Sequence, residues 1–179
     1  MTPEFSRPVA VQELGPGPNK FELSAETGER RALARRFGLL SLTRLDAWIT
    51  IQPGADGQRL SLRADFRADV VQSCVVSTEP VESRIEAALD LHFAPSDEIA
   101  RERIVEIELD AEDPPEAIFD GQIDMGEVIA EHLALELDPF PRAEGATFNG
   151  METGDQMDGG EKSLAGPLAA LAKLRPKIK

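Results

Sequence analysis

The chain of 179 residues has the length of one domain, and its 41% apolar content is enough to build a single core. One cysteine excludes an intrachain disulfide and leaves too few thiols for a structural zinc site. The formal net charge of −14 argues against broad affinity for nucleic acid, since that affinity comes from Lys and Arg side chains that neutralise phosphates.

The charge is spread unevenly along the chain. Residues 101–161 carry 3 basic and 18 acidic side chains, whereas residues 162–179 carry 5 basic and no acidic ones. The simplest interpretation is that the acidic part is solvated surface that keeps the protein in solution. No apolar run approaches the roughly 20 residues that cross a bilayer, and the start of the chain lacks the features of a signal peptide. We therefore expect a cytoplasmic protein.

The N-terminal part predicts two extended pieces and one helix. The extended pieces lie within residues 4–25 and are joined by residues 15–19, whose glycines and prolines predict a hairpin or a broad loop. A short helix is expected over residues 27–37, because apolar residues recur four apart and Gly38 suits a helix end. The basic residues of this helix are compatible with a solvated face or with contact to RNA phosphates. They are Arg30, Arg31, Arg35 and Arg36.

Apolar and polar residues alternate in four segments, the pattern of strands that bury one face. The segments are residues 45–52, 60–70, 85–93 and 105–109. No regular helix separates them, and a parallel crossover would need roughly a dozen residues or more. We therefore expect an α+β fold with a mainly antiparallel sheet, curled or barrel-like, and two short helices.

The second helix is expected over residues 125–137, with Asp124 at its N-cap and Pro139 beyond its end. The segment before it, residues 110–120, is acidic and contains two adjacent prolines, which predicts a surface loop.

The C-terminal part is expected to lie outside the domain of residues 1–142. Residues 143–161 have too few apolar side chains to offset the entropy lost on ordering, so we expect a flexible linker. Residues 162–179 form a basic tail that is too short to be a stable helix alone.

The segment VVQSCVVSTEPVES joins two of the expected strands and contains Cys74 and Pro80. It resembles the C-x-x-C-L-x-P motif of the YceD family, bacterial and plastid proteins associated with accumulation of large-subunit ribosomal RNA. Ser77 stands where the family usually has its second cysteine, and Thr78 stands where it has leucine.

Two further segments, residues 32–39 and 123–142, resemble the N-terminal and C-terminal blocks of alphaproteobacterial members of this family. The positions that carry the resemblance are Cys74, Ser77, Glu79, Pro80 and Asp124. The resemblance implies a non-enzymatic role in assembly of the large ribosomal subunit, affecting processing or accumulation of its RNA.

An alternative is a small hydrolase that uses Cys74 or the acidic loop of residues 110–120. A reactive thiol needs a cation or a helix start nearby, but the neighbours of Cys74 are valines, so we expect it to be a core cysteine. His92 and His132 form no metal-ligand spacing, and no nucleotide-binding motif is present. The sequence therefore predicts no catalytic residue, no metal ligand and no cofactor.

An acidic body is unusual for a protein connected with RNA. We hypothesise that its carboxylates contact a basic ribosomal protein or a large-subunit precursor particle, and that the basic tail reaches adjacent RNA. The candidate partner-binding residues lie on the two helices and the tail. They are Arg30, Arg31, Arg35, Arg36, Glu127, Glu131, Lys173, Arg175, Lys177 and Lys179.

Overall fold

The structure, a computed structural model, describes residues 3–54, 58–96, 99 and 114–147. The elements in chain order are β1 (Pro8–Ala10), the 3-10 helix η1 (Val11–Glu13), β2 (Asn19–Ser24), α1 (Thr27–Phe37), β3 (Ser41–Pro53), β4 (Leu60–Ser73), β5 (Pro80–Pro95), β6 (Glu116–Ile118), β7 (Gln122–Asp124) and α3 (Met125–Glu136). The chain divides into two units, Met1–Ala146 and Thr147–Lys179, and all of these elements belong to the first.

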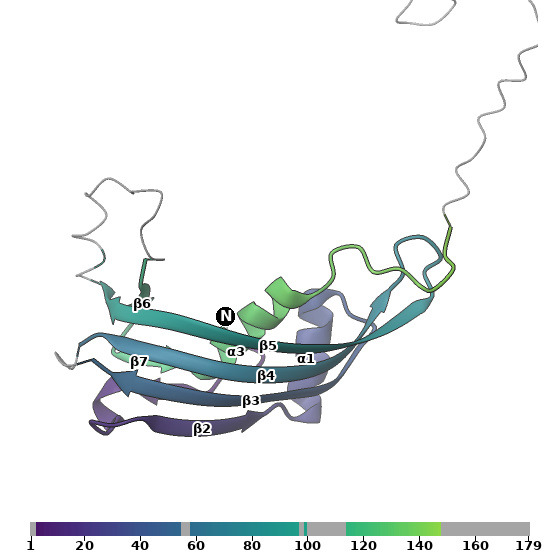
Figure 1. Cartoon of the computed structure of the whole chain (residues 1–179). Helices are drawn as coiled ribbons and strands as arrows, with labels where there is room; N and C mark the ends of the chain where they lie inside the picture. Colours follow the sequence, from purple (N-terminus) through teal and green to yellow (C-terminus); the bar gives the residue numbers. More distant parts are fainter. Residues whose placement is uncertain (1–2, 55–57, 97–98, 100–113, 148–179) are drawn as a thin grey trace, which may run out of the picture. The chain divides into compact units, whose positions relative to one another are not determined.

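Five strands form one sheet in the order β2-β3-β4-β5-β6 (Figure 1). Strands β2 to β5 pair antiparallel in chain order, whereas β6 runs parallel to the end of β5. The long strands curve, but within the described chain no strand joins the two edges into a barrel. The expected α+β fold with a mainly antiparallel, curled sheet is confirmed, and the sheet stays open.

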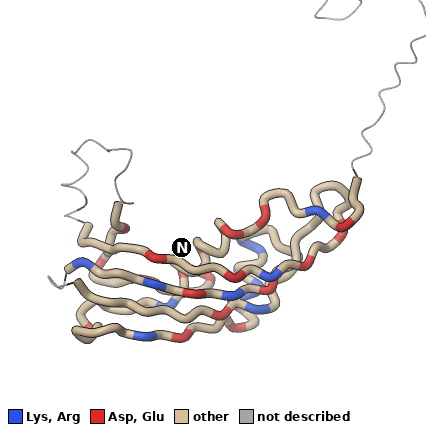
Figure 2. Tube along the Cα trace, viewed as in Figure 1, with Lys and Arg blue, Asp and Glu red and all other residues tan. Residues whose placement is uncertain are grey.

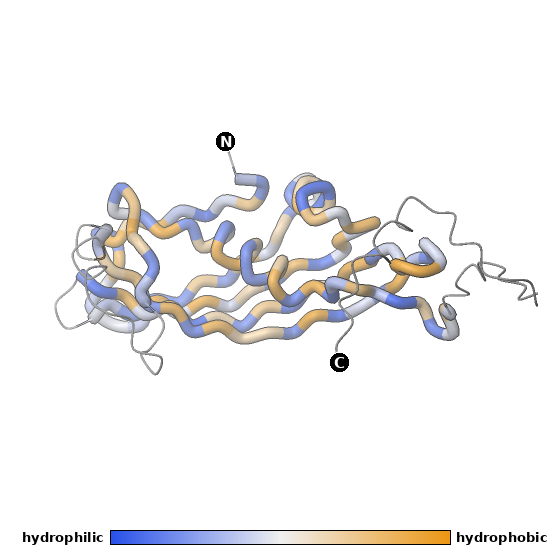
Figure 3. Tube along the Cα trace, turned by 90° about the horizontal axis from the view of Figure 1, so that it is seen from above, coloured by the Kyte–Doolittle hydropathy of each residue, from blue (hydrophilic) through white to orange (hydrophobic). Residues whose placement is uncertain are grey.

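The core lies between the sheet and the two helices, which cover the same face of it (Figures 1 and 3). On β4, Leu62, Phe66 and Val70 are at most 1% exposed and face the helices. Arg63, Asp65, Arg67 and Asp69 face the opposite side, because successive side chains of a strand alternate between its two faces. The apolar residues of the alternating pattern therefore face the core, and the polar residues face the solvent.

Both helices lie where the sequence predicts them, to within one residue at each end. Helix α1 begins with a capping box, in which the side chains of Glu26 and Glu29 bond to each other's backbone amides. It ends at Gly38, whose φ of 67° places it in the left-handed region that favours glycine.

At the ends of the sheet, the structure decides between two alternatives and corrects one expectation. Strands β1 and β2 do not pair with each other, because β1 pairs with β7 and β2 with β3, so residues 11–18 form a broad connection and not a hairpin turn. The expected loop of residues 110–120 is wrong at Glu116–Ile118, which form β6 because the backbone of Phe93–Pro95 at the end of β5 pairs with them. The expected strand at residues 105–109 lies outside the described residues.

Candidate partner-binding site

Arg36 and Glu127, which the sequence suggested as separate contacts for a partner, bind each other. The guanidinium Nη1 and Nη2 of Arg36 lie 3.0 and 2.7 Å from the two carboxylate oxygens of Glu127, and Nη1 also lies 3.1 Å from Glu4. Hydrogen bonding to Glu127 raises the pKa of Arg36 above its ordinary value. The pair joins α1 to α3, and its charges neutralise each other.

The other arginines of α1 differ in how strongly they are held. Arg30 donates hydrogen bonds to the backbone carbonyl of Ala25 and to the hydroxyl of Thr27. Arg31 and Arg35 are exposed, and neither has an ion pair within the described chain. These two line a groove of about 540 Å³ between α1 and the start of β3. Of the cluster, they are the cations that an external anion reaches without breaking an ion pair or a hydrogen bond of the described chain.

Asp124 ties the start of α3 to the N-terminal segment. Its Oδ1 accepts hydrogen bonds from the backbone amides of Gly126 and Glu127, at 3.0 and 3.2 Å, as its predicted N-cap role requires. The same carboxylate accepts from the amide of Arg7 at 2.6 Å and from the hydroxyl of Ser6 at 2.5 Å. These bonds assign Asp124 a structural role.

A second ion pair, which sequence reasoning missed, holds the N-terminal segment against α1. Arg7 Nη1 and Nη2 lie 2.7 and 3.0 Å from the carboxylate oxygens of Glu29. This hydrogen-bonded contact lowers the pKa of Glu29. The two residues are 22 positions apart and follow no periodic pattern, so the sequence carries no signal for the pair.

Cys74 lies in the loop between β4 and β5 and is 1% exposed, which confirms the expected burial. Its Sγ accepts hydrogen bonds from the backbone amides of Val76 and Ser77, at 3.4 and 3.3 Å. The backbone amide of Ala143, together with these donors, lowers the pKa of the thiol to about 6. The donors are backbone amides and the Ser77 side chain, and none of them is a charged group. That the buried thiol is unreactive stays a prediction.

The loop that contains Cys74 is braced by the segment that follows α3. The amide of Val75 donates to the carbonyl of Pro141 at 2.9 Å. The side chain of Gln72 donates to the carbonyl of Asp138, also at 2.9 Å. The motif loop and the C-terminal end of the folded body therefore form one packed unit.

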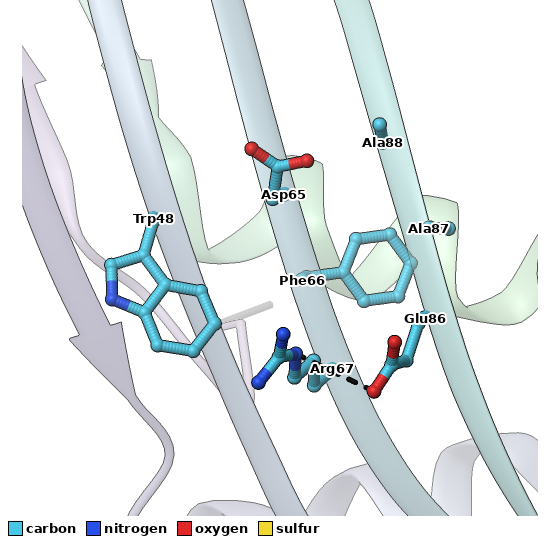
Figure 4. A pocket seen from close by; sticks show the side chains of 7 residues that line it. All are labelled: Trp48, Asp65, Phe66, Arg67, Glu86, Ala87 and Ala88. Atoms are coloured by element: carbon cyan, nitrogen blue, oxygen red, sulfur yellow. Dashed lines mark ion pairs between the residues drawn. The ribbon is translucent and has the colours of Figure 1, made fainter.

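The face of the sheet away from the helices carries alternating charges that pair across strands. The N–O distances are 2.8 Å for Arg63–Asp90, 2.8 Å for Arg84–Asp69 and 3.5 Å for Arg67–Glu86. Arg67 also lies over the ring of the half-exposed Trp48, 5.6 Å from its centroid (Figure 4). Because each of these cations meets a carboxylate, this face offers little net positive charge to RNA phosphates.

Carboxylates without an ion pair are most concentrated, within the described chain, in and around α3; Figure 2 marks the Asp and Glu positions in red. Residues 114–147 contain eight acidic side chains and one basic side chain, Arg142. Asp124 caps the helix and Glu127 pairs with Arg36. The other six have no ion pair within the described chain; they are Glu116, Asp120, Glu131, Glu136, Asp138 and Glu144.

Several remaining predictions are not covered by these contacts. The tail residues Lys173, Arg175, Lys177 and Lys179 lie outside the described residues. Among the residues that the structure describes, no three His, Cys, Asp or Glu side chains are grouped to hold a metal ion. No helix in the described part of the chain is long and apolar enough to span a membrane.

Residues 62–175 match the model of the family described as large ribosomal RNA subunit accumulation protein YceD. This match covers more than half of the 179 residues. The chain belongs to the YceD family. The family description connects YceD proteins with accumulation of large-subunit ribosomal RNA and names no enzymatic activity. Comparisons with curated proteins and with solved structures found no match.

The YceD match begins inside β4 and includes the loop with Cys74, helix α3 and part of the tail. The resemblance of residues 32–39 to the family lies before the matched region and stays a prediction. At the second cysteine position of the YceD motif, the hydroxyl of Ser77 donates to the carboxylate of Glu79 at 3.0 Å. In this chain the motif therefore acts through hydrogen bonds that shape the loop.

Proposed function

We propose that this YceD protein is a non-enzymatic factor that supports accumulation of large-subunit ribosomal RNA by binding a basic ribosomal protein within the precursor particle. The observation that carries the proposal is the set of six unpaired carboxylates around α3. Carboxylates that have no cation within their own chain are available to lysines and arginines of a partner, and complementary charge speeds encounter and selects among partners.

The rest of the described surface supports a protein partner over naked RNA. The arginines on the open face of the sheet pair with carboxylates, and Arg36 pairs with Glu127. A chain with a net charge of −14 repels a phosphate backbone except where cations are concentrated. In this proposal the tail beyond residue 161 reaches neighbouring RNA while the acidic surface holds the basic protein.

The proposal is tested with the full chain and two charge variants of equal size. Glu131→Gln combined with Glu136→Gln removes two exposed carboxylates from α3, and Glu13→Gln combined with Glu22→Gln removes two exposed carboxylates elsewhere. Gradient sedimentation of cell extract should show the wild type travelling with large-subunit precursors, the α3 variant largely lost from them, and the second variant unchanged.

Binding to purified components completes the test. Proteins extracted from large ribosomal subunits should bind the full chain in a salt-sensitive way, and naked large-subunit RNA should bind only weakly. Tight binding to naked RNA together with no binding to the proteins would overturn the proposal.

A further inference from the structure

Within the described chain, the longest strand of the sheet has one edge that is almost free. Strand β5 has 16 residues and pairs with β4 from Pro80 to Phe93. On its other edge, β6 pairs only with Phe93–Pro95, so no strand of the described chain lies beside residues 80–92 there (Figure 1). The backbone amides and carbonyls that point away from β4 along this stretch form a row that another strand can pair with.

The inner side of β5 is also incompletely covered. On β4, Leu62 and Ala64 are 0% and 3% exposed, whereas their cross-strand partners on β5, Leu91 and Leu89, are only partly buried. The helices therefore close over the middle of the sheet and leave an apolar margin along β5. An added strand would bury this margin with its own apolar side chains.

The strand carries charged side chains but lacks other features that protect an edge. Between Pro80 and Pro95 it contains no proline and no lysine, and the register with β4 is continuous. Prolines, lysines and bulges are absent over a stretch long enough to pair with ten or so residues of a partner strand. This favours a role in recognition.

Charge selects the kind of segment that fits. The solvent side of β5 carries three carboxylates and one arginine, which are Glu82, Arg84, Glu86 and Asp90. Asp90 and Glu86 pair with Arg63 and Arg67 of β4, and Arg84 pairs with Asp69, so Glu82 is the carboxylate of this side that has no ion pair within the described chain. Helix α3, which packs against β5, adds the unpaired carboxylates of Glu131 and Glu136. A second copy of β5 would place carboxylates against carboxylates, and a nucleic acid would be repelled. A lysine- or arginine-bearing segment has the complementary charge.

We propose that the free edge of β5 binds an extended segment of a basic protein as an additional strand opposite residues 81–91. Apolar side chains of the segment pack beside Ile85 and Leu89, and its alternate lysines or arginines lie beside the outward carboxylates of β5. Main-chain hydrogen bonds between the segment and β5 supply affinity, and the alternation of apolar and basic side chains in the segment supplies specificity. The inference that the basic protein is ribosomal rests on the proposed function. The inference that it binds as an added strand does not depend on that function.

The test uses the full chain and a fluorescent peptide of about ten residues in which valine and lysine alternate. A peptide of the same composition, with valines and lysines in separate blocks, is the control. The alternating peptide should bind more tightly, and it should slow hydrogen exchange at those amides of residues 81–91 that point away from β4.

Variants at Ala88 test whether the peptide binds at the free edge of β5. Ala88 is exposed on the solvent side of β5 and makes no ion pair, so its replacement breaks no salt bridge. Ala88→Lys should weaken peptide binding roughly two- to fivefold, and Ala88→Glu should strengthen it by a similar factor. Glu22→Gln, on the opposite edge strand β2, changes the net charge as much as Ala88→Lys does and should have no such effect.

Equal binding of both peptides, or no response to Ala88→Lys in a variant that still unfolds cooperatively, would overturn the inference. It would also fail if the outward amides of residues 81–91 are already protected in the free protein, because the chain itself would then occupy the edge. If the peptide does not bind but the wild type still sediments with precursors in an α3-dependent way, the edge inference fails alone. If the peptide binds but no sedimentation with precursors occurs, only the proposed function fails.

Discussion

Arg36 of α1 and Glu127 of α3 form a bidentate ion pair, 91 residues apart in sequence, with N–O distances of 2.7 and 3.0 Å. Partly exposed ion pairs stabilise proteins by about 0.2–1 kcal/mol, and bidentate Arg–carboxylate pairs lie at the upper end of this range. We therefore expect Glu127→Gln to lower the free energy of unfolding by about 1 kcal/mol, measured by urea denaturation. Added salt should shrink the difference.

The matched control for this pair is Glu131→Gln, which removes a carboxylate with no ion pair from the same helix. It should change stability by no more than about 0.5 kcal/mol. If Glu127→Gln leaves stability unchanged and abolishes sedimentation with precursors, Glu127 is a partner contact and not a structural one.

Gly126 marks the closest approach between α3 and the N-terminal segment. A Cβ at this position would lie 2.3 Å from the carbonyl oxygen of Phe5 and 3.1 Å from the amide of Arg7. Gly126→Ala must therefore displace backbone, and we expect it to cost at least about 2 kcal/mol of stability.

Gly28 provides a control in the corresponding position of α1, the second residue of the helix. A Cβ there meets no atom within 4 Å, and alanine suits a helix better than glycine. Gly28→Ala should raise stability by about 0.4–1 kcal/mol. Thermal unfolding of both variants compares them directly, and similar melting temperatures would contradict the close contact at Gly126.

The thiol of Cys74 should make stability depend on pH. Its folded pKa of about 6 lies below the ordinary value of 9.0. A group with a lowered folded pKa stabilises the fold fully above its unfolded pKa, and this contribution is lost as the pH falls through the folded value. The advantage in unfolding free energy of the wild type over Cys74→Ala should therefore be largest at pH 9 and shrink steadily toward pH 6.

Burial should nevertheless keep Cys74 unreactive. With 1% of the residue exposed, alkylation of the native protein at neutral pH should be slow and should speed up only when denaturant opens the loop. Fast labelling of the folded chain, with loss of a hydrolytic activity on modification, would favour the hydrolase alternative.

Arg31 and Arg35 should carry whatever contact α1 makes with RNA phosphates, because Arg36 is held by two carboxylates. Replacing both with glutamine should weaken the low affinity of the full chain for RNA and reduce the salt slope by about 1.5. The control is Arg63→Gln with Arg84→Gln, which removes two cations that already pair with carboxylates on the sheet. Equal effects of the two double variants on RNA binding would show that Arg31 and Arg35 make no specific contact with RNA phosphates.

Much of the secondary structure could be predicted because it depends on local patterns. The alternation around Phe66 and the cap at Asp124 are each encoded within a few residues of the elements that they define. The pairing of β1 with β7 and the parallel pairing of β6 with β5 are not encoded locally, since the paired segments are distant in sequence. Strands β1, β6 and β7 also have only three residues each. Segments that short carry too few residues for a periodic signal.

The sequence by itself determined the acidic charge of this protein and its main secondary-structure elements. These elements are an antiparallel sheet that alternates apolar and charged residues and two capped helices. The sequence also contains the motif around Cys74. Only the tertiary structure decided which charges remain available. It joined Arg36 to Glu127 and Arg7 to Glu29, placed backbone amides at the sulfur of Cys74, and left one edge of β5 largely without a partner strand among the described residues. The physical reason is that ion pairs, amide donors and strand edges depend on distances between segments far apart in the chain, whereas periodicity and capping depend on neighbours.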